Sequence, residues 1–393
     1  MSQTLKFPKN FLWGAAVSSY QVEGDIENCD WSKKFPAGKA CQYYSRYEKY
    51  FDLAKELNQN VHRFSLEWSR IQPSEGKFDC GEIEHCRKVL LALKKRNMKS
   101  MVTIWHYTLP LWLSKKGGWQ NSKIVEYFQQ YAEFVVEELD DLVDFWITLN
   151  EPSIYISLAY VAGKFPPQKK NILSVLPIFF NFINAHKKAY FVIHDFNKNT
   201  KVGIAENYSF VDAYDKKSFL NNKAVSVWNF LNNHLFLKLT ENCHDYLGVN
   251  YYFHSRIKIS PSSFPPIEIK NENKEISDMG WEIFPEGIYY VIMDLKKYGL
   301  PIYITENGIA DKTDKRRTKF IVDHLKWMYK AIREGVDVRG YMHWSLFDNF
   351  EWNSGFAKRF GLIEVNHKTL ETKIRPSAYE YAKICKDNSL TIT

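Results

Sequence analysis

The segment Asp144-Phe-Trp-Ile-Thr-Leu-Asn-Glu-Pro152 is a run of aromatic, β-branched and aliphatic residues that ends in Asn150, Glu151 and a proline. This composition favours a β-strand, and a proline cannot continue a central strand. A second segment, Pro301-Ile-Tyr-Ile-Thr-Glu-Asn-Gly308, has the same layout, with Gly308 permitting a sharp exit after Glu306. Both segments therefore predict a strand that delivers a glutamate at its C-terminal end.

Six more segments have a strand-like composition: 11–16, 61–68, 100–107, 201–208, 245–252 and 338–348. Amphipathic helical patterns fill most of the gaps, as in 82–97, 123–139 and 318–334. Alternating strands and helices are typical of a parallel sheet, and eight such units predict closure into a (β/α)8 TIM barrel of the α/β class. Because no linker or low-complexity tract interrupts the pattern, residues 1–393 are predicted to form a single domain.

Charge and hydropathy exclude two classes of partner. The net charge is +8, but the basic residues are scattered. The densest basic stretch, 312–319, is expected to be a solvated loop and helix start, whereas a nucleic-acid surface would need a wider basic face with interleaved aromatics. The most apolar stretch, 172–183, is too short to span a bilayer and is broken by Pro177 and Asn181, so it predicts a barrel helix. We expect neither a nucleic-acid partner nor stable membrane insertion.

The cysteines and histidines lack the spacing of metal or redox motifs. Six cysteines occur without a C-x-x-C pair or a disulfide-like framework, which is typical of a reducing compartment. The N-terminal residues contain no apolar signal-peptide core, so a cytoplasmic location is expected. No H-E-x-x-H or comparable cluster appears, so neither a metal nor a cofactor is predicted.

Polar and aromatic residues stand at the ends of all eight predicted strands. In a (β/α)8 barrel these ends share one face, where active sites lie. Glycoside hydrolysis needs one carboxylic acid that protonates the leaving oxygen and a second carboxylate that attacks the anomeric carbon or activates water. Glu151 and Glu306 are therefore the candidate pair. Without further motifs, a buried salt-bridge role for either would be equally acceptable.

Six motifs, in order along nearly the whole chain, resemble glycoside hydrolase family 1, the β-glucosidases and β-galactosidases. The motifs are Phe11-Leu-Trp-Gly-Ala-Ala with Ser19-Tyr-Gln-Val-Glu-Gly24, His62-Arg-Phe-Ser-Leu-Glu-Trp-Ser-Arg70, Thr148-Leu-Asn-Glu-Pro152, Gly248-Val-Asn-Tyr-Tyr252, Tyr303-Ile-Thr-Glu-Asn-Gly308 and His343-Trp-Ser-Leu-Phe-Asp-Asn-Phe-Glu-Trp352.

This resemblance implies a retaining, exo-acting β-glycosidase that forms a covalent glycosyl-enzyme intermediate on a small β-glycoside or oligosaccharide. Glu151 would be the general acid/base and Glu306 the nucleophile. Arg63, Asn250 and Tyr252 would support the nucleophile. The residues expected to contact substrate are Gln21, His106, Asn150, Tyr252, Trp281, Trp344, Glu351 and Trp352, with Trp281 on the aglycone side.

Two departures from the family pattern affect the aglycone side. Tyr107 stands where the family usually has Trp or Phe, and the chain between Asn207 and Asn250 is short. Three alternatives remain: a 6-phospho-β-glycosidase, a transglycosidase that uses the same intermediate, and a non-catalytic sugar-binding barrel. Glu351 would repel a sugar phosphate, and the presence of both glutamates disfavours a non-catalytic barrel. Epimer preference and oligomeric state stay open.

Overall fold

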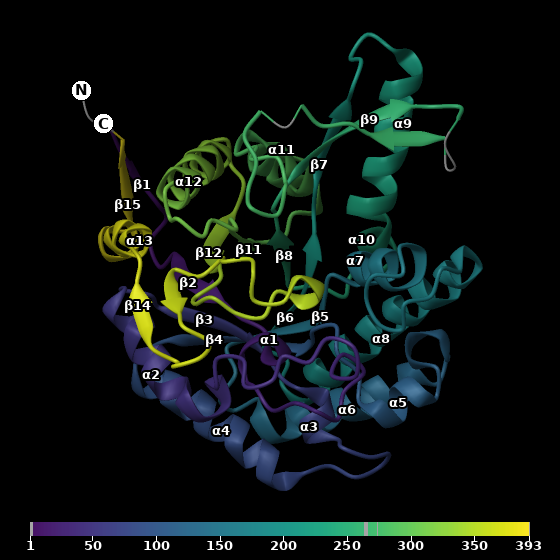
Figure 1. The fold of residues 1–393 in the computed structure, drawn as a ribbon, viewed down its shortest axis with the longest axis vertical. Coiled ribbons are helices and arrows are strands. Elements are labelled where there is room, and N and C mark those ends of the chain that lie inside the picture. The colour runs from purple at the N-terminus through teal and green to yellow at the C-terminus, as the bar shows by residue number, and fades with distance from the viewer. Residues whose placement is uncertain (1–2, 263–265, 273, 393) are drawn as a thin grey trace.

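The computed structural model describes residues 3–262, 266–272 and 274–392. Eight parallel strands form a closed barrel at its centre, which confirms the predicted fold (Figure 1). In chain order they are β2 (Leu12–Ala16), β3 (Val61–Ser65), β4 (Lys99–Trp105), β5 (Phe145–Asn150), β6 (Lys201–Asn207), β8 (Tyr246–Asn250), β11 (Ile302–Asn307) and β12 (Val338–Trp344). The barrel closes between its first and last strands, where Gly14 of β2 lies opposite Met342 of β12.

Helices surround the barrel. The longer ones are α2 (Tyr43–Glu56), α4 (Cys80–Lys95), α6 (Ile124–Leu139), α8 (Val175–Phe196), α9 (Phe219–Asn229), α11 (Glu286–Leu295), α12 (Arg317–Arg333) and α13 (Pro376–Asp387). The predicted helices are found, with small shifts at their ends. For example, α4 begins two residues earlier than predicted because the Asp79 side chain accepts hydrogen bonds from the backbone N–H groups of Gly81 and Glu82.

Four short helices follow barrel strands: α1 (Ser19–Val22), α3 (Trp68–Ile71), α5 (Leu111–Lys115) and α7 (Pro152–Ile156). A fifth, α10 (Leu235–Leu239), lies between α9 and β8. The apolar stretch 172–183 lies in a 3-10 turn (Ile172–Ser174) and the first half of α8, as predicted. Pro177 sits in the first turn of α8, where a missing backbone N–H does no harm. Among the described residues, none of the helices has the length and apolarity that a bilayer crossing requires.

Three small antiparallel or mixed sheets decorate the barrel: β1 (Gln3–Lys6) with β15 (Ser389–Ile392), β7 (Phe210–Ala213) with β9 (His254–Ile259) and β10 (Ile267–Ile269), and β13 (Ile363–Val365) with β14 (Thr372–Ile374). Between β9 and β10, residues 263–265 lie outside the described part of the chain.

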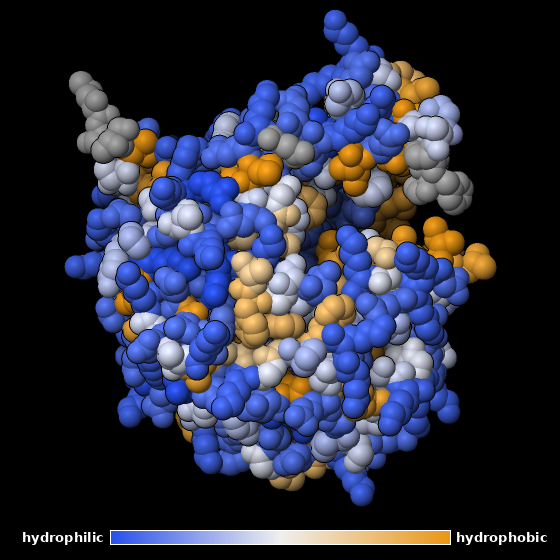
Figure 2. Space-filling view, viewed as in Figure 1, coloured by the Kyte–Doolittle hydropathy of each residue, from blue (hydrophilic) through white to orange (hydrophobic). Residues whose placement is uncertain are grey.

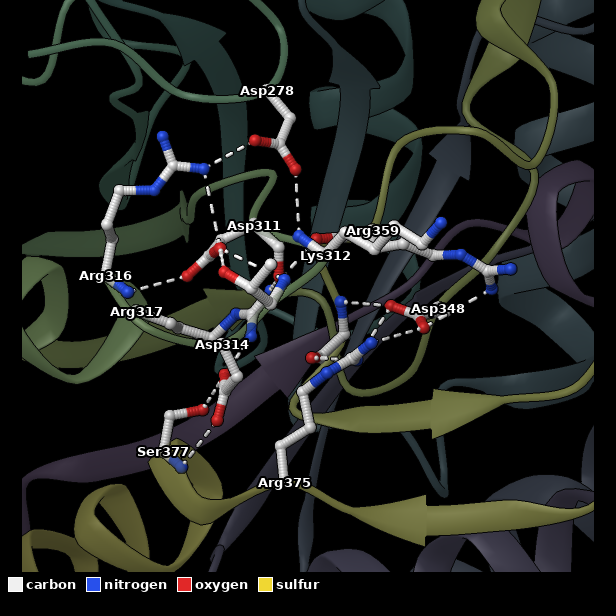
Figure 3. Close-up of polar contacts among 12 residues, drawn as sticks. Asp278, Asp311, Lys312, Asp314, Arg316, Arg317, Asp348, Arg359, Arg375 and Ser377 are labelled. Atoms are coloured by element: carbon white, nitrogen blue, oxygen red, sulfur yellow. Dashed lines mark hydrogen bonds and ion pairs between the residues drawn. The ribbon is translucent and has the colours of Figure 1, made fainter.

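The basic stretch 312–319 forms a loop and the start of α12, as predicted, but it is only partly solvated. Lys315 is exposed, but Arg317 is fully buried and pairs with Asp314. Arg316 is half-buried and reaches Asp278 at 2.5 Å (Figure 3). These side chains turn inward because carboxylates from neighbouring loops surround them, which a sequence pattern does not reveal.

The same close-up shows how the loop after β12 is anchored. Asp348 accepts two hydrogen bonds of 2.9 Å from the Arg375 guanidinium and one of 3.0 Å from the Gly361 backbone N–H (Figure 3). Arg375 directly precedes α13. This buried pair therefore ties the loop that carries Glu351 to the last helix.

Candidate active site

Glu151 stands at the junction of β5 and α7. Its φ of 45° is in the left-handed region, and Pro152 takes the first helical position, where proline is well tolerated. The Glu151 backbone N–H donates to the Ala205 carbonyl oxygen at 2.7 Å, so the neighbouring strand holds this turn. Non-glycine residues in this region are strained and concentrate at functional sites. The strand therefore ends by turning Glu151 into the rim of the barrel.

Three neutral donors contact the buried Glu151 carboxyl group. Asn250 Nδ2 lies 2.8 Å and Asn207 Nδ2 3.2 Å from Oε1, and the Tyr107 hydroxyl donates to Oε2. Burial raises the pKa of Tyr107 well above 10, and the nearby Glu151 raises it further, so this phenol is protonated and acts as the donor. Glu151 thus has no cationic partner among these contacts.

Glu306, at the end of β11, has a different set of partners. Arg63 Nη1 lies 2.5 Å from Oε1, and the Tyr252 hydroxyl donates to Oε2 at 2.5 Å. Burial raises the pKa of Glu306 to about 7; the Arg63 guanidinium and the Tyr252 hydrogen bond work against this rise, and the proximity of Glu151 adds to it. A pKa near 7 leaves the carboxyl group divided between its two protonation states around neutrality.

Arg63 connects the two halves of the site. Its Nη2 donates to Asn150 Oδ1 at 2.6 Å, while Nη1 also donates to the Thr305 carbonyl oxygen at 3.1 Å. Only 1% of the Arg63 residue surface is exposed. A guanidinium has a rigid set of donors, so this one side chain fixes the relative positions of β3, β5 and β11.

The family resemblance implies that Arg63, Tyr252 and Asn250 support Glu306. The structure places Arg63 and Tyr252 on Glu306, but it places the Asn250 amide on Glu151. The reason is that β8 lies between β6 and β11 in the barrel. A side chain at the end of β8 can therefore turn toward Glu306 on β11, or the other way, past β6, toward Glu151 after β5. The Asn250 Oδ1 atom accepts a 2.7 Å hydrogen bond from the Thr305 hydroxyl, and this fixes the direction of its Nδ2 toward Glu151.

A second polar group lies beside the two glutamates. Gln21 Nε2 donates to the Phe350 carbonyl oxygen at 2.9 Å and reaches Glu351 Oε2 at 3.3 Å, and its Oε1 accepts from Ser18 at 2.7 Å. Burial raises the pKa of Glu351 to about 8, with a further contribution from the charge of Glu306. A buried amide and a buried carboxyl group in contact are well suited to bind a ligand with several hydroxyl groups.

Aromatic rings line the same region. The His106 ring lies 6.1 Å from Trp344 and 5.9 Å from Trp352, nearly parallel to both. His106 Nε2 also contacts Asn150 Nδ2 at 3.2 Å. Farther out, the half-buried Trp281 lies 5.6 Å from Tyr252, between ring centroids. Flat apolar faces beside polar groups are typical of sites that bind sugar rings, because the rings present both kinds of surface.

Two contacts were missing from the predicted site. In the sequence, Tyr107 is only a departure from the family pattern and Asn207 only the start of a short stretch of chain, but both side chains touch Glu151. The signal for Asn207 was its place at the end of β6. Tyr107 follows His106 and has a positive φ of 73°, which turns its side chain in a direction that strand alternation does not predict.

Chemically, the arrangement pairs one carboxyl group that contacts a cation with another that contacts only neutral donors. This asymmetry suits a division of labour between a nucleophile and an acid/base. Within residues 3–262, 266–272 and 274–392, no group of three or more His, Cys, Asp or Glu side chains is placed to hold a metal ion.

Comparison with known proteins gives a consistent result. Residues 3–241 and 236–390 match Glycosyl hydrolase family 1. Beta-glucosidase A of Thermotoga maritima is 31% identical over 446 residues, covering 98% of this chain and 99% of that protein. A beta-galactosidase of Pyrococcus woesei is also 31% identical, with 98% of each chain covered.

Solved structures agree. A beta-glycosidase from Pyrococcus horikoshii is 35% identical, with a TM-score of 0.94 over 99% of this chain and 96% of that chain. A beta-glucosidase from Thermotoga maritima, solved in complex with glucoimidazole, is 29% identical with a TM-score of 0.92, over 98% of this chain and all of that chain. This chain therefore belongs to glycosyl hydrolase family 1.

Proposed function

We propose that the protein is a retaining, exo-acting β-glycosidase in which Glu306 is the nucleophile and Glu151 the general acid/base. The observation that carries the proposal is the asymmetry of the two carboxyl groups: Arg63 and Tyr252 contact Glu306, whereas Glu151 contacts only amides and a phenol. A nucleophile must be anionic when it attacks, and an acid must carry a proton that it can release.

The proposed reaction has two steps. In the first, a Glu306 carboxylate oxygen forms a bond to the anomeric carbon while the glycosidic bond breaks, and Glu151 gives its proton to the departing oxygen. In the second, the Glu151 carboxylate takes a proton from water, the water oxygen attacks the anomeric carbon, and the ester bond to Glu306 breaks. Two inversions return the original configuration.

We propose that residues around the two glutamates hold the sugar. Gln21, Glu351, His106 and Asn150 would bind its hydroxyl groups, Trp344 and Trp352 would contact its ring, and Trp281 would line the aglycone side. We propose β-glucosides as the preferred substrates, as in the Thermotoga beta-glucosidases. The Pyrococcus woesei relative is a beta-galactosidase, so a panel of aryl β-glycosides that differ at one hydroxyl is the test.

A phosphorylated sugar is the less favoured substrate. Lys358 donates to the Asp278 carbonyl oxygen, and Arg359 contacts Asp348 at 3.4 Å and the Val365 carbonyl oxygen at 3.1 Å. Both cations are therefore occupied within the protein. Including 6-phospho-β-glycosides in the panel tests this directly, and a supply of sugar acceptors in the same assays measures transglycosylation.

Two further parts of the proposal concern the whole chain. Residues 1–393 are proposed to act as one domain, because the barrel strands span the chain and close on one another. The protein is proposed to be cytoplasmic, since all six cysteines are free.

The decisive experiment assigns the two glutamates by rescue. In Glu306→Ala, turnover should fall by several orders of magnitude, and azide should restore part of it while giving the α-glycosyl azide. In Glu151→Ala, azide should give the β-glycosyl azide, and substrates with activated leaving groups should retain their first step. The proposal fails if the two variants give azides of the same configuration or if the β-glycosyl azide comes from Glu306→Ala.

A further inference from the structure

Exposed apolar side chains are concentrated in one part of the molecule. Among the described residues, eighteen large hydrophobic side chains are exposed, and thirteen of them lie between Val161 and Leu231. This segment is less than a fifth of the chain. Isolated exposed apolar residues are ordinary, but a contiguous group marks a surface that binds something.

Two groups of residues from this segment define what we call the apolar face. Their exposed fractions range from 46% for Phe230 to 85% for Leu173. The first group, from the turn before α8 and its first half, is Ile172, Leu173, Leu176 and Phe180; the second, from α9 and the π-helical turn that follows it (Phe230–His234), is Phe219, Leu220, Val227, Phe230 and Leu231.

The two groups belong to neighbouring elements. Phe179 of α8 packs against Phe236 of α10, with ring centroids 5.9 Å apart, and α10 directly follows the π-helical turn. Figure 2 shows apolar residues gathered along the edge of the molecule where Figure 1 places α8, α9 and α10. The spacing 220, 227 and 231 puts three of these residues on one side of a helix, so α9 presents an apolar stripe outward.

The two stretches of chain that carry this face contain charges of one sign only, although Asp212 and Asp294 contact them from neighbouring elements. The chain carries no aspartate or glutamate between Glu151 and Asp195, and none between Asp215 and Glu241. The same two stretches contain nine lysines: Lys164, Lys169, Lys170, Lys187, Lys188, Lys216, Lys217, Lys223 and Lys238. Apolar side chains on segments rich in lysine, with few neighbouring acids, match the chemistry of an anionic lipid surface. There the apolar side chains enter the boundary of the acyl region and the lysines meet the headgroups.

A second copy of this chain fits the face less well. A symmetric dimer brings the same patch of both copies together. Such a contact would place lysines opposite lysines, with no carboxylate from these stretches to pair them, and like charges brought together in an interface oppose association.

We propose that the apolar face docks the protein reversibly onto anionic lipid membranes. The binding is peripheral, through side chains at the surface of α8 and α9, and requires no helix to cross the bilayer. Because the electrostatic part is screened by salt, binding should weaken as ionic strength rises.

The test is sedimentation of the full chain with vesicles of phosphatidylcholine and phosphatidylglycerol mixed at about 7:3, and with phosphatidylcholine vesicles alone. Wild type should pellet with the mixed vesicles and much less with the neutral ones. Leu173→Glu/Leu220→Glu should lower the partition coefficient by about tenfold or more, since it removes two apolar contacts and adds two negative charges.

The matched control is Leu91→Glu/Tyr379→Glu, which makes the same change of charge at two side chains that are each 49% exposed on α4 and α13. It should bind the mixed vesicles nearly as wild type does, and thermal melts followed by circular dichroism verify that both variants fold. The proposal is overturned if wild type does not bind, or if the control loses as much binding. It is also overturned if sedimentation velocity shows a dimer that Leu173→Glu/Leu220→Glu dissociates while no vesicles are bound.

Discussion

Each of the two glutamates accepts a hydrogen bond from a tyrosine that a single substitution can remove. The Tyr252 hydroxyl donates a hydrogen bond to Glu306. Burial raises the pKa of Glu306 to about 7. The phenol stabilises the carboxylate, so Tyr252→Phe should raise this pKa further, by about one to two units if the bond contributes the ~1.5–3 kcal/mol typical of a hydrogen bond to a charged group. Because only the carboxylate attacks, kcat/KM should be lost as pH falls through the pKa, and this acid limb should move to higher pH in the variant.

The control for that experiment is Tyr290→Phe, which removes an exposed phenol bonded to Glu286 and should leave the pH profile in place. If the acid limb of the kcat/KM profile lies at the same pH in Tyr252→Phe as in wild type, this hydrogen bond does not set the pKa of Glu306.

Tyr107 offers a test on the other glutamate. Tyr107→Phe keeps the ring and removes the donor to Glu151 Oε2. A less firmly held acid should matter most when the leaving group needs its proton, so kcat/KM should fall about tenfold for alkyl glycosides, corresponding to one hydrogen bond of ~1.4 kcal/mol, and less for nitrophenyl glycosides. Comparing the two substrate classes in wild type and variant measures the difference. An equal loss for both classes would argue for a general packing effect.

The sequence predicts which residues lie at the barrel rim. It is less informative about which side chains they contact there. Glu151 and Glu306 could be identified because each ends an apolar strand and stands in a family motif. The contact of Asn250 could not, since its strand has a glutamate-bearing neighbour on one side and Asn207 and Glu206 on the other. Which neighbour an amide faces depends on a hydrogen bond from Thr305, and this is a matter of three-dimensional placement.

Among the elements, the loop after β12 depends on the pair formed by Asp348 and Arg375. Both side chains are buried, and Arg375→Ala leaves the Asp348 carboxylate with only the longer 3.4 Å contact to Arg359 as a cationic partner. The substitution should therefore lower the free energy of unfolding by about 3 kcal/mol. The loop carries Glu351, which would bind the sugar, so KM should rise as well. Denaturant unfolding and steady-state kinetics provide the two measurements.

Arg339→Ala is the comparison, because Arg339 makes a 2.7 Å ion pair with Asp337 where both side chains are about half exposed. Such surface pairs contribute about 0–1 kcal/mol. Similar losses in the two variants would mean that burial of the Asp348 pair has little effect on stability.

The elements were predictable to different degrees. Barrel strands and long helices follow from the alternation and periodicity of apolar residues, which buried surfaces impose locally. The π-helical turn at Phe230–His234 and the sheet of β7, β9 and β10 were not predicted. Those strands are short, and β7 pairs with β9 across some 40 residues of chain, as Phe210 does with His254. The stability of this sheet therefore depends partly on contacts that a local pattern does not record.

For the whole molecule, two sets of buried groups should give stability a maximum in pH. The first set consists of six buried histidines, and burial lowers their pKa values below the ordinary 6.5: His62, His106, His186, His244, His324 and His343. The second is five carboxyl groups whose pKa burial raises to about 7 or 8: Glu23, Asp30, Glu206, Glu306 and Glu351.

The signs of the two sets are opposite. Below pH 6.5 these histidines bind protons in the unfolded chain but stay neutral in the folded protein. The folded state therefore loses stability as pH falls. Above about pH 4.5 the unfolded chain releases protons that the folded carboxyl groups keep, so stability is lost as pH rises, until their folded pKa values of 7 to 8 are passed. The terms oppose each other between about pH 4.5 and 6.5, and only the carboxyl term acts above that. Calorimetry should therefore find the highest Tm near pH 6 and a lower Tm at pH 8; a Tm that rises between pH 6.5 and 8 would contradict this account.

The closure of the barrel between β2 and β12 has a consequence for biosynthesis. Gly14 leaves the ribosome early, but its partner Met342 emerges only after most of the chain has been made. Protein synthesis proceeds at about 5–20 residues per second, so the edge of β2 stays unpaired for on the order of 16 to 65 seconds. Throughout that time the growing half-barrel exposes unpaired backbone groups and the apolar surface beside them, a form prone to aggregation. Nascent chains stalled before residue 338 should therefore be good clients for ribosome-associated chaperones, and release from those chaperones should coincide with the arrival of the last strand.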